Sequence, residues 1–301
     1  VSINTKFKVT LRLFKKIPYL LKTYISPHIF RDALQFLLVS NKKITNIFPV
    51  EVHITEHCNL NCKGCSHFSS LAGEEYLDTV DFERDCQLLS RLTDKLYAFK
   101  LLGGEPLLHP RITEFNDIAR KYFPGIPIQI ITNGTLLTKQ SGEFWENCHK
   151  NKIKILISQY PIKLNKKEIK NTAKKYKVDI EYAGTTNKDR MCKMPLDLRG
   201  NQSIAESYKN CIMSWGMCIT LRDGKIYPCS TPAHIKFFNK YFDKNLIVSE
   251  SDYADLCKIN SKKELVDFLC KPPEFCRYCR TTETGFGETW DISKKEITEW
   301  L

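Results

Sequence analysis

The sequence predicts an α/β fold in which β-α units build a parallel sheet of the barrel type. Between residue 48 and about residue 200, short apolar runs alternate with helical patterns, as in repeated β-α units. Glycine or polar residues follow several of the apolar runs, and the ends of the strands are where such folds place their functional groups. The chain has 301 residues, 42% of them hydrophobic, and it can therefore bury a large core.

The elements follow from these patterns in order. The apolar runs predict strands at 50–55, 97–102, 127–132, 153–158, 178–183 and 195–199. The helical patterns between them predict helices at 81–95, 111–122, 138–150 and 165–176, the first after an Asp78-Thr79 cap signal. Beyond residue 200 the pattern changes, because residues 219–227 form two short apolar runs around an Asp-Gly turn, which predicts a hairpin. A helix near 261–270 follows. We therefore expect three parts: a basic helical segment (1–47), the β-α part (48–200) and a smaller domain (201–301).

The first 45 residues are strongly basic. They hold nine Lys or Arg and one acidic residue, Asp32, so they carry +8 of the net charge of +12. Basic helices of this kind either pack on the rest of the protein or lie on an anionic membrane surface. No nucleic-acid-binding motif accompanies the charge, and we expect no nucleic-acid partner. No apolar run reaches the roughly 20 residues that cross a bilayer. We expect a cytoplasmic protein, with contact to the inner membrane face as the alternative.

Three cysteines, Cys58, Cys62 and Cys65, lie on one short loop after the 50–55 strand. The chain has thirteen cysteines, and the odd number and tight spacing predict reduced, metal-bound thiols in place of disulfides. Three thiolates on one loop can hold three corners of a cubane iron–sulfur cluster and leave one iron without a protein ligand. A zinc site is the alternative, although zinc usually takes four protein ligands or three plus water.

The Cys-x3-Cys-x2-Cys loop, with Gly103-Gly104-Glu105-Pro106 after the second strand, resembles the radical S-adenosylmethionine (SAM) superfamily over residues 48 to about 200. The resemblance implies a partial (β/α)6 TIM-like barrel and a 4Fe–4S cluster whose open iron binds SAM. It also implies reductive cleavage of SAM to a 5′-deoxyadenosyl radical. The residues that it assigns to SAM binding are Gly103, Gly104, Glu105, Pro106, Phe68, Thr132, Asn133 and Ser158. One position departs from the family: Gly64 stands where an aromatic residue usually contacts adenine, so that Phe68 or His67 would supply the missing surface.

A second set of cysteines follows residue 200 and comprises Cys211, Cys229, Cys276 and Cys279. Its spacing resembles the shortened SPASM, or twitch-type, auxiliary domain of some radical SAM enzymes, which implies a second, auxiliary 4Fe–4S cluster. A zinc ribbon is the alternative. Cys218 lies close enough in sequence to replace Cys211 as a ligand, or it is a free thiol that can donate a hydrogen atom.

Enzymes with one such barrel and a short single-cluster domain act on carbohydrate-like rings, and others modify ribosomally made peptides. We expect hydrogen abstraction from a carbohydrate carbon in glycan or sugar-derived metabolite biosynthesis. Epimerisation is favoured over dehydrogenation, because Cys218, Cys192 and Cys257 are candidate hydrogen-atom donors. The alternatives are modification of a ribosomally made peptide, by epimerisation or cross-linking, and a non-catalytic zinc-binding interaction protein. The expected partners are a small-molecule or glycan substrate and an electron donor such as flavodoxin or ferredoxin.

Overall fold

The computed structural model describes residues 49–93, 95–183, 190–211, 213, 218–283 and 285–301, and only the backbone of 190–193 and 285–288. Contacts divide the chain into two units, Val1–Ile44 and Thr45–Leu301, and the structure described below belongs to the second. The predicted basic helices of 1–47 lie outside the described residues. In the described part, no helix is long and apolar enough to cross a bilayer.

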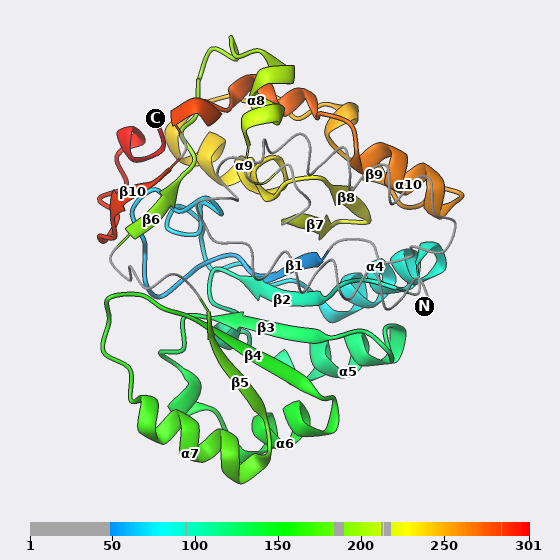
Figure 1. The fold of residues 1–301 in the computed structure, drawn as a ribbon, viewed down its shortest axis with the longest axis vertical. Coiled ribbons are helices and arrows are strands. Elements are labelled where there is room, and N and C mark those ends of the chain that lie inside the picture. Colours follow the sequence, from blue (N-terminus) through cyan, green and yellow to red (C-terminus); the bar gives the residue numbers. More distant parts are fainter. Residues whose placement is uncertain (1–48, 94, 184–189, 212, 214–217, 284) are drawn as a thin grey trace, which may run out of the picture. The chain divides into compact units, whose positions relative to one another are not determined.

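An eight-stranded sheet forms the centre of the described part, in the order β5-β4-β3-β2-β1-β7-β8-β9 (Figure 1). Its strands are β1 (Val50–Thr55), β2 (Phe99–Gly103), β3 (Ile128–Thr132), β4 (Ile153–Ser158), β5 (Asp179–Ala183), β7 (Ile219–Arg222), β8 (Lys225–Tyr227) and β9 (Ala254–Asp255). Strands β1 to β5 are parallel, and β7 pairs in parallel with β1. The two edge strands, β5 and β9, do not pair with each other in the described part. The α/β fold with a partial barrel is therefore confirmed.

Four helices follow the strands: α4 (Thr79–Leu92), α5 (Ile112–Tyr122), α6 (Gly142–Lys150) and α7 (Lys166–Tyr176). Side chains of Asp78, Ser141 and Asn165 cap α4, α6 and α7 by accepting backbone N–H groups of the first turn, which fixes where each helix begins. The helices lie along one side of the parallel strands (Figure 1). The predicted β-α alternation is thus present up to β5.

Each parallel strand turns alternate residues toward these helices. Val50, Val52 and Ile54 of β1 belong to one core with Phe82 and Leu89 of α4. Successive strand residues point to opposite sides, so the residues between them form an interior face away from the helices. This interior face comprises Glu51, His53, Lys100, Leu102, Gln129, Ile131, Lys154, Leu156, Ser158, Thr220 and Arg222.

The C-terminal half adds α8 (Ile204–Asn210), α9 (Ser230–Phe242) and α10 (Lys262–Leu269). A second core joins Phe68, beside the cysteine loop, to Phe238 of α9 and Trp300. The hairpin predicted at 219–227 forms as β7 and β8, and these strands extend the barrel sheet. The division of the chain at residue 200 stays a prediction.

The strand predicted at 195–199 does not form. The strand of this region is β6 (Arg190–Lys193), which pairs with β10 (Gly285–Thr289) in a separate antiparallel sheet. Within 195–199 only Leu196 makes an isolated bridge, to Cys279. The Asp197 carboxylate accepts the N–H groups of Arg199 and Asn201, and this local turn competes with strand pairing.

Candidate functional site

The loop after β1 places three cysteine side chains around one cavity. Cys58, Cys62 and Cys65 line this cavity, which we call the cysteine cavity, with residues from the ends of β2, β3 and β4. Five of the eight residues predicted to bind SAM are in its wall: Gly103, Gly104, Thr132, Asn133 and Ser158. The wall is completed by Leu60, His67, Ser69, Ser70, Leu102, Ile131 and Tyr160. The carboxyl ends of four parallel strands therefore meet at this cavity, as a barrel fold requires.

The cysteine thiols of the cavity are poorly solvated. Burial raises the pKa of Cys58 to about 11 and that of Cys62 to about 12, and it also raises the pKa of Cys65. Such thiols stay protonated near neutral pH unless a metal takes the place of the proton. No fourth cysteine of the described residues lines the cavity. Three cysteines around one cavity, Cys62 buried and Cys58 and Cys65 half-buried, fit a cluster that keeps one iron open.

The glycines after β2 let that strand approach the cysteine loop closely. The Gly104 N–H donates to the Thr55 carbonyl at 2.8 Å, and the Glu105 N–H donates to the His57 carbonyl at 3.1 Å. A Cβ on Gly104 would lie 1.9 Å from the His57 carbonyl oxygen. Only glycine fits at this position, so Gly104 fixes the start of the cysteine loop as well as lining the cavity.

Glu105 lies behind the cavity wall. Its carboxylate accepts hydrogen bonds from Thr132 Oγ1 at 2.5 Å, from the Asn133 N–H at 2.9 Å and from the Leu107 N–H at 3.2 Å. Burial raises the pKa of Glu105 to about 7, although these three donors act in the opposite direction. Neither Glu105 nor Pro106 lines the cavity. In this geometry Glu105 holds the end of β3 against the end of β2.

Phe68 points away from the cavity. Its ring packs near those of Phe238 and Trp300 in the second core, whereas His67 lines the cavity. Gly64 has a positive φ of 60°, and a Cβ there would lie 2.7 Å from the Glu299 carbonyl oxygen. The space that an aromatic side chain would need is thus occupied by the C-terminal segment.

Residues 290–301, which we call the C-terminal clasp, hold the cysteine loop in place. Backbone hydrogen bonds join Lys63 to Asp291 at 2.8 Å and Ser293 to Asn61 at 2.7 Å. Two indole groups add to them: Trp300 Nε1 donates to the Cys65 carbonyl at 2.9 Å, and Trp290 Nε1 donates to Cys62 Sγ at 3.1 Å. An N–H donor on a sulfur atom is a contact typical of the surroundings of metal-bound thiolates. The sequence indicated a tail around Trp290 and Asp291 that could close over the substrate, but not its contacts with the cysteine loop, whose partners are 228 and 235 positions apart.

The second set of cysteines also gathers around one pocket. Its wall includes Cys211, Cys229, Cys276 and Cys279, and we call it the auxiliary pocket. Cys218 is outside this wall, and its Sγ lies 3.4 Å from Met213 Sδ. The sequence left open whether Cys211 or Cys218 belongs to this set. The structure places Cys211 with Cys229, Cys276 and Cys279.

The two cysteine sets lie at opposite ends of β1. Cys58 follows the carboxyl end of β1, whereas Cys218 directly precedes β7, whose Ile219 pairs with Val50 at the amino end. Cys229 follows β8, the hairpin partner of β7. At about 3.3 Å per residue, the ends of β1 are about 17 Å apart. The interior face of the sheet lies between them.

The predicted hydrogen-atom donors differ in position. Cys218 is half-buried, and it is close enough to Glu51 and Lys100 of the interior face for their charges to act on its thiol. Cys257 is exposed in the turn after β9 and lines neither the cysteine cavity nor the auxiliary pocket. Cys192 lies in β6, and its side chain is outside the described residues. Of the two candidates whose side chains are described, Cys218 is thus the one that lies near the interior face.

Two ion pairs are buried on and beside the interior face. Lys100 Nζ lies 2.7 Å from Glu51 Oε1, and Arg222 Nη1 pairs with Glu56 Oε1. The partners are 49 and 166 residues apart in sequence. The sequence reasoning missed these four residues, because only the strand pairing brings them together.

Comparisons with known proteins agree with this arrangement. Residues 52–159 match the family model described as the Radical SAM superfamily. The chain is 34% identical over 111 residues to the GTP 3′,8-cyclase of Chlorobaculum tepidum, covering 36% of this chain and 33% of that protein. It is 31% identical over 94 residues to the S-adenosylmethionine-dependent nucleotide dehydratase of Selenomonas ruminantium, covering 30% and 31%. The chain thus spans about one third of the length of these curated relatives.

Solved structures are similar over longer stretches at low identity. BtrN in complex with AdoMet and 2-DOIA is 18% identical, covering 78% of this chain and 93% of that chain, with a TM-score of 0.48. The structure of anSMEcpe with bound AdoMet and the Cp18Cys peptide is 18% identical, covering 45% and 42%, with a TM-score of 0.36. From the family match, which includes Cys58, Cys62 and Cys65, the chain carries a radical SAM superfamily domain, whose family binds SAM and a 4Fe–4S cluster.

Proposed function

We propose that this protein is a radical SAM enzyme that abstracts a hydrogen atom from a carbohydrate carbon and epimerises that carbon, in the synthesis of a glycan or sugar-derived metabolite. The observation that carries the proposal is the cysteine cavity, in which Cys58, Cys62 and Cys65 face the ends of β2, β3 and β4. When a 4Fe–4S cluster and SAM are bound there, they supply a 5′-deoxyadenosyl radical. The wall residues of the chain orient SAM and keep water away.

The spacing of the sulfur atoms supports clusters over single zinc ions. Zinc lies about 2.3 Å from each thiolate in a tetrahedral site, which requires sulfur atoms about 3.8 Å apart. In the described part of the chain, the group that brings three potential ligand atoms within 4.8 Å of one another is His53, Glu56 and His234. Neither cysteine set is that compact. This argues against the rival in which both sets hold zinc in a non-catalytic protein.

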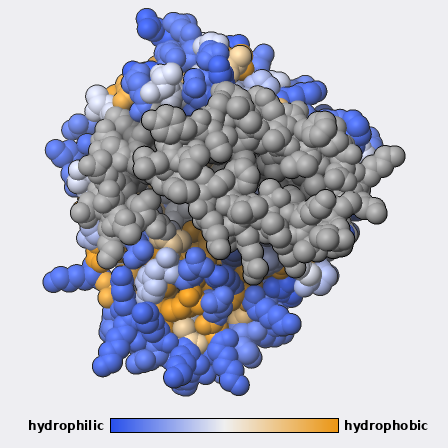
Figure 2. All heavy atoms as spheres, in the orientation of Figure 1, coloured by the Kyte–Doolittle hydropathy of each residue, from blue (hydrophilic) through white to orange (hydrophobic). Residues whose placement is uncertain are grey.

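The interior face supports a hydroxylated substrate without phosphate groups. Its β3 and β4 side is partly apolar, with Ile131 and Leu156, and Figure 2 shows hydrophobic residues gathered over the region of β3 to β5. Its β1, β2 and β7 side is polar, and there Lys100 and Arg222 each pair with a carboxylate. A sugar ring offers both apolar C–H faces and hydroxyl edges, so it complements such a surface.

A nucleotide is the second candidate substrate, because the similar proteins named above include GTP 3′,8-cyclase and a nucleotide dehydratase. Phosphate groups are usually bound by cations that they can neutralise. Lys100 and Arg222 are already neutralised by Glu51 and Glu56, which favours the carbohydrate. Modification of a ribosomally made peptide is the remaining alternative.

Cys218 fits the role of the thiol that completes an epimerisation. The substrate carbon loses a hydrogen atom on one face, and the Cys218 S–H bond then breaks to give a hydrogen atom to the opposite face. To restore the Cys218 thiol, its sulfur needs one electron and one proton. A cluster held by Cys211, Cys229, Cys276 and Cys279 would supply the electron, solvent the proton, and a flavodoxin or ferredoxin would replace that electron. In dehydrogenation the auxiliary cluster would instead accept the substrate electron, and no thiol would be needed.

Metal content and SAM cleavage test the first half of the proposal. Anaerobically purified protein should be brown and hold about eight irons in two cubanes, and with a reductant it should convert SAM to 5′-deoxyadenosine. Replacing Cys58, Cys62 and Cys65 together by Ala should remove half of the iron and all cleavage. Replacing Cys86, which is buried in α4, by Ala should change neither. A colourless, zinc-containing protein would overturn the proposal.

Deuterated water tests the second half. Reduced enzyme is incubated with SAM and candidate sugars or glycans without phosphate groups, and in parallel with sugar nucleotides, nucleotides or precursor peptides, and the products are analysed by mass spectrometry and NMR. Epimerisation through a thiol leaves one deuterium on carbon in a carbohydrate product, because the S–H group exchanges with solvent. A product oxidised by two hydrogens, or turnover of only nucleotides or peptides, would contradict it.

A further inference from the structure

We propose that His53, Glu56 and His234 form a mononuclear site for a divalent transition metal, with Zn²⁺ as the best-fitting ion. The site lies apart from the walls of the cysteine cavity and the auxiliary pocket. Of these three side chains, the proposed function uses only Glu56, whose Oε1 pairs with Arg222. The inference does not depend on that function.

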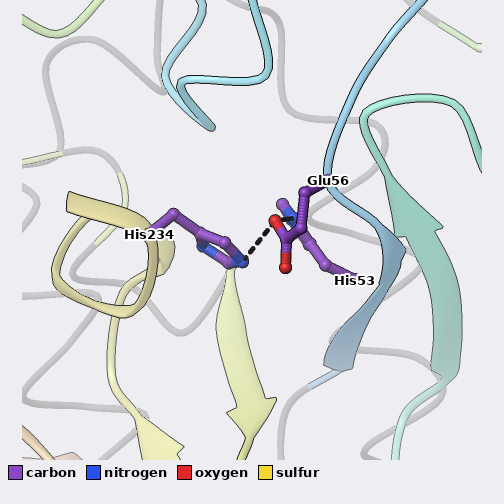
Figure 3. Close-up of side chains that lie close together, drawn as sticks. All are labelled: His53, Glu56 and His234. Carbon is purple, nitrogen blue, oxygen red and sulfur yellow. Dashed lines mark ion pairs between the residues drawn. The ribbon is translucent and has the colours of Figure 1, made fainter. Parts of the chain in front are cut away.

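The three side chains converge from two elements that are distant in sequence. His53 lies in β1, Glu56 directly follows β1, and His234 lies in α9; Figure 3 shows His234 and Glu56 directed toward each other, with the His53 ring beside the carboxylate. Glu56 Oε2 lies 3.6 Å from His53 Nδ1 and 3.8 Å from His234 Nε2. Ligands about 2.1 Å from a tetrahedral zinc ion are about 3.4 Å from one another. The two separations from Glu56 are close to that value, and the three ligand atoms all lie within 4.8 Å of one another.

The atoms that face one another have no other partner. Side-chain exposure is 1% for His53, 7% for Glu56 and 0% for His234. In the described part of the chain, both ring nitrogens of His53, Oε2 of Glu56 and Nε2 of His234 lack a hydrogen bond. Buried polar atoms nearly always have a partner, and an unsatisfied one is costly. A cation at the centre of the three would satisfy one atom of each residue.

Hydrogen bonds around the site prepare these atoms to bind a metal. The His234 Nδ1 lies 2.9 Å from the Ser230 carbonyl oxygen, to which it can only donate, so the lone pair is on Nε2, the atom that faces Glu56. Burial lowers the pKa of His234 well below its ordinary value, which keeps the ring neutral. Arg222 binds Oε1 of Glu56 and leaves Oε2 for the metal. Metal-bound histidines and carboxylates are oriented by such outer contacts.

The geometry of His53, Glu56 and His234 is harder to explain if no metal ion binds to them. The separations of 3.6 and 3.8 Å are too long for hydrogen bonds, so without an ion the facing atoms of the three side chains stay unsatisfied. The rings of His53 and His234 stack with centroids 3.7 Å apart, which holds the two imidazoles side by side. Three protein ligands also leave a fourth position for water or substrate, as in catalytic zinc sites. His67, whose ring centroid lies 4.5 Å from that of His53, stands between this site and the cysteine cavity.

X-ray absorption at the zinc edge tests the site directly. Protein with reconstituted clusters is treated with EDTA, given one equivalent of Zn²⁺ and desalted. The first shell should contain nitrogen and oxygen at about 2.0 to 2.1 Å and no sulfur at about 2.3 Å. This readout separates the proposed site from zinc misplaced in a cysteine set. Iron content and SAM cleavage, measured on the same sample, report separately on the proposed function.

Matched variants then assign the ligands. His234→Gln and His53→Gln should each lose the retained zinc and the zinc-dependent rise in Tm. His149→Gln, which changes an exposed histidine on α6, should keep both. Far-UV circular dichroism checks that each variant is folded. The X-ray absorption spectrum of the wild type tests the site even if a variant does not fold. A shell containing sulfur, no zinc retained by the wild type, or equal zinc in all three variants would overturn the inference.

Discussion

The indole N–H of Trp290 donates to the Sγ of Cys62 at 3.1 Å. The two residues are 228 positions apart, so the C-terminal clasp reaches the sulfur of a predicted cluster ligand. Hydrogen bonds to cluster sulfur atoms stabilise the reduced, more negative state and raise its potential. Trp290 is thus placed to make the cluster easier to reduce.

Trp290→Phe should lower the reduction potential of the cluster in the cysteine cavity. A hydrogen bond with a net value of about 0.5 to 1.5 kcal/mol corresponds to about 20 to 60 mV for one electron. The potential is measured by electron paramagnetic resonance of samples poised at a series of potentials. Trp300→Phe is the control, because its indole donates to the Cys65 carbonyl and not to sulfur. Equal potentials in Trp290→Phe and wild type would show that the contact does not tune the cluster.

Gly104→Ala should destabilise the protein and disturb the cysteine loop. The new Cβ would lie 1.9 Å from the His57 carbonyl oxygen, and a backbone atom cannot move aside as a side chain can. We expect a loss of about 1 to 3 kcal/mol in the free energy of unfolding, together with reduced iron content. Gly73→Ala is the matched control, because nothing lies within 4 Å of its Cβ position. Denaturant unfolding and iron analysis check both, and similar losses in the two variants would contradict the steric explanation.

Glu105 should make stability fall as pH rises from about 4.5 to about 7. Burial raises the pKa of Glu105 from 4.5 to about 7, so in this window the folded protein holds a proton that the unfolded chain has released. The stabilisation that this proton gives is fully present below the pKa of Glu105 in the unfolded chain. It is lost as the pH rises through the pKa of Glu105 in the folded protein. The total change is about 3 kcal/mol, at about 1.4 kcal/mol per pKa unit.

The Glu105→Gln variant isolates this contribution, because glutamine does not titrate. Urea unfolding of the wild type and the variant is measured at pH 5, 6, 7 and 8, and the difference between the two proteins is plotted against pH. Stability curves that run parallel would show that the Glu105 pKa is not raised by folding.

Cys218→Ser should separate SAM cleavage from product formation. Without the thiol, the substrate radical has no hydrogen atom to accept, so 5′-deoxyadenosine should still form while the epimerised product falls at least tenfold. Cys257→Ser should retain full activity, because Cys257 is exposed and lines neither pocket. Liquid chromatography with mass spectrometry measures both products in one assay. Full activity of the Cys218, Cys192 and Cys257 variants would leave dehydrogenation as the better reading.

Local signals in the sequence were enough for most of the barrel. Apolar runs predict the strands, and the cap residue Asp78 predicts the start of α4. Both signals come from residues that are close together in the chain. The strand predicted at 195–199 was wrong, since the Asp197 side chain binds its own backbone there. The grouping of the cysteines could be expected from spacing and family resemblance, whereas the position of Phe68 could not, because a second core competes for its ring.

The interior of the site depends on contacts between distant residues. His53 and His234 stack although α9 follows β1 by more than 170 residues, and no periodicity or motif signals such a contact. Position 64 likewise holds glycine in place of the expected aromatic residue, because a side chain there would collide with the Glu299 carbonyl oxygen. Side chains that meet only through tertiary structure were thus the ones that the sequence reasoning missed.

The pairing of β7 with β1 and the contact of the clasp with the cysteine loop have a consequence for biosynthesis. On the ribosome, β1 and its loop emerge first, yet one edge of β1 stays bare until residues 219–222 have been made. The loop lacks its contacts with the C-terminal clasp until residues 290–301 follow. Iron delivered earlier would meet thiols on an unformed loop, so maturation of this centre has to wait for nearly the whole of this sequence to be translated.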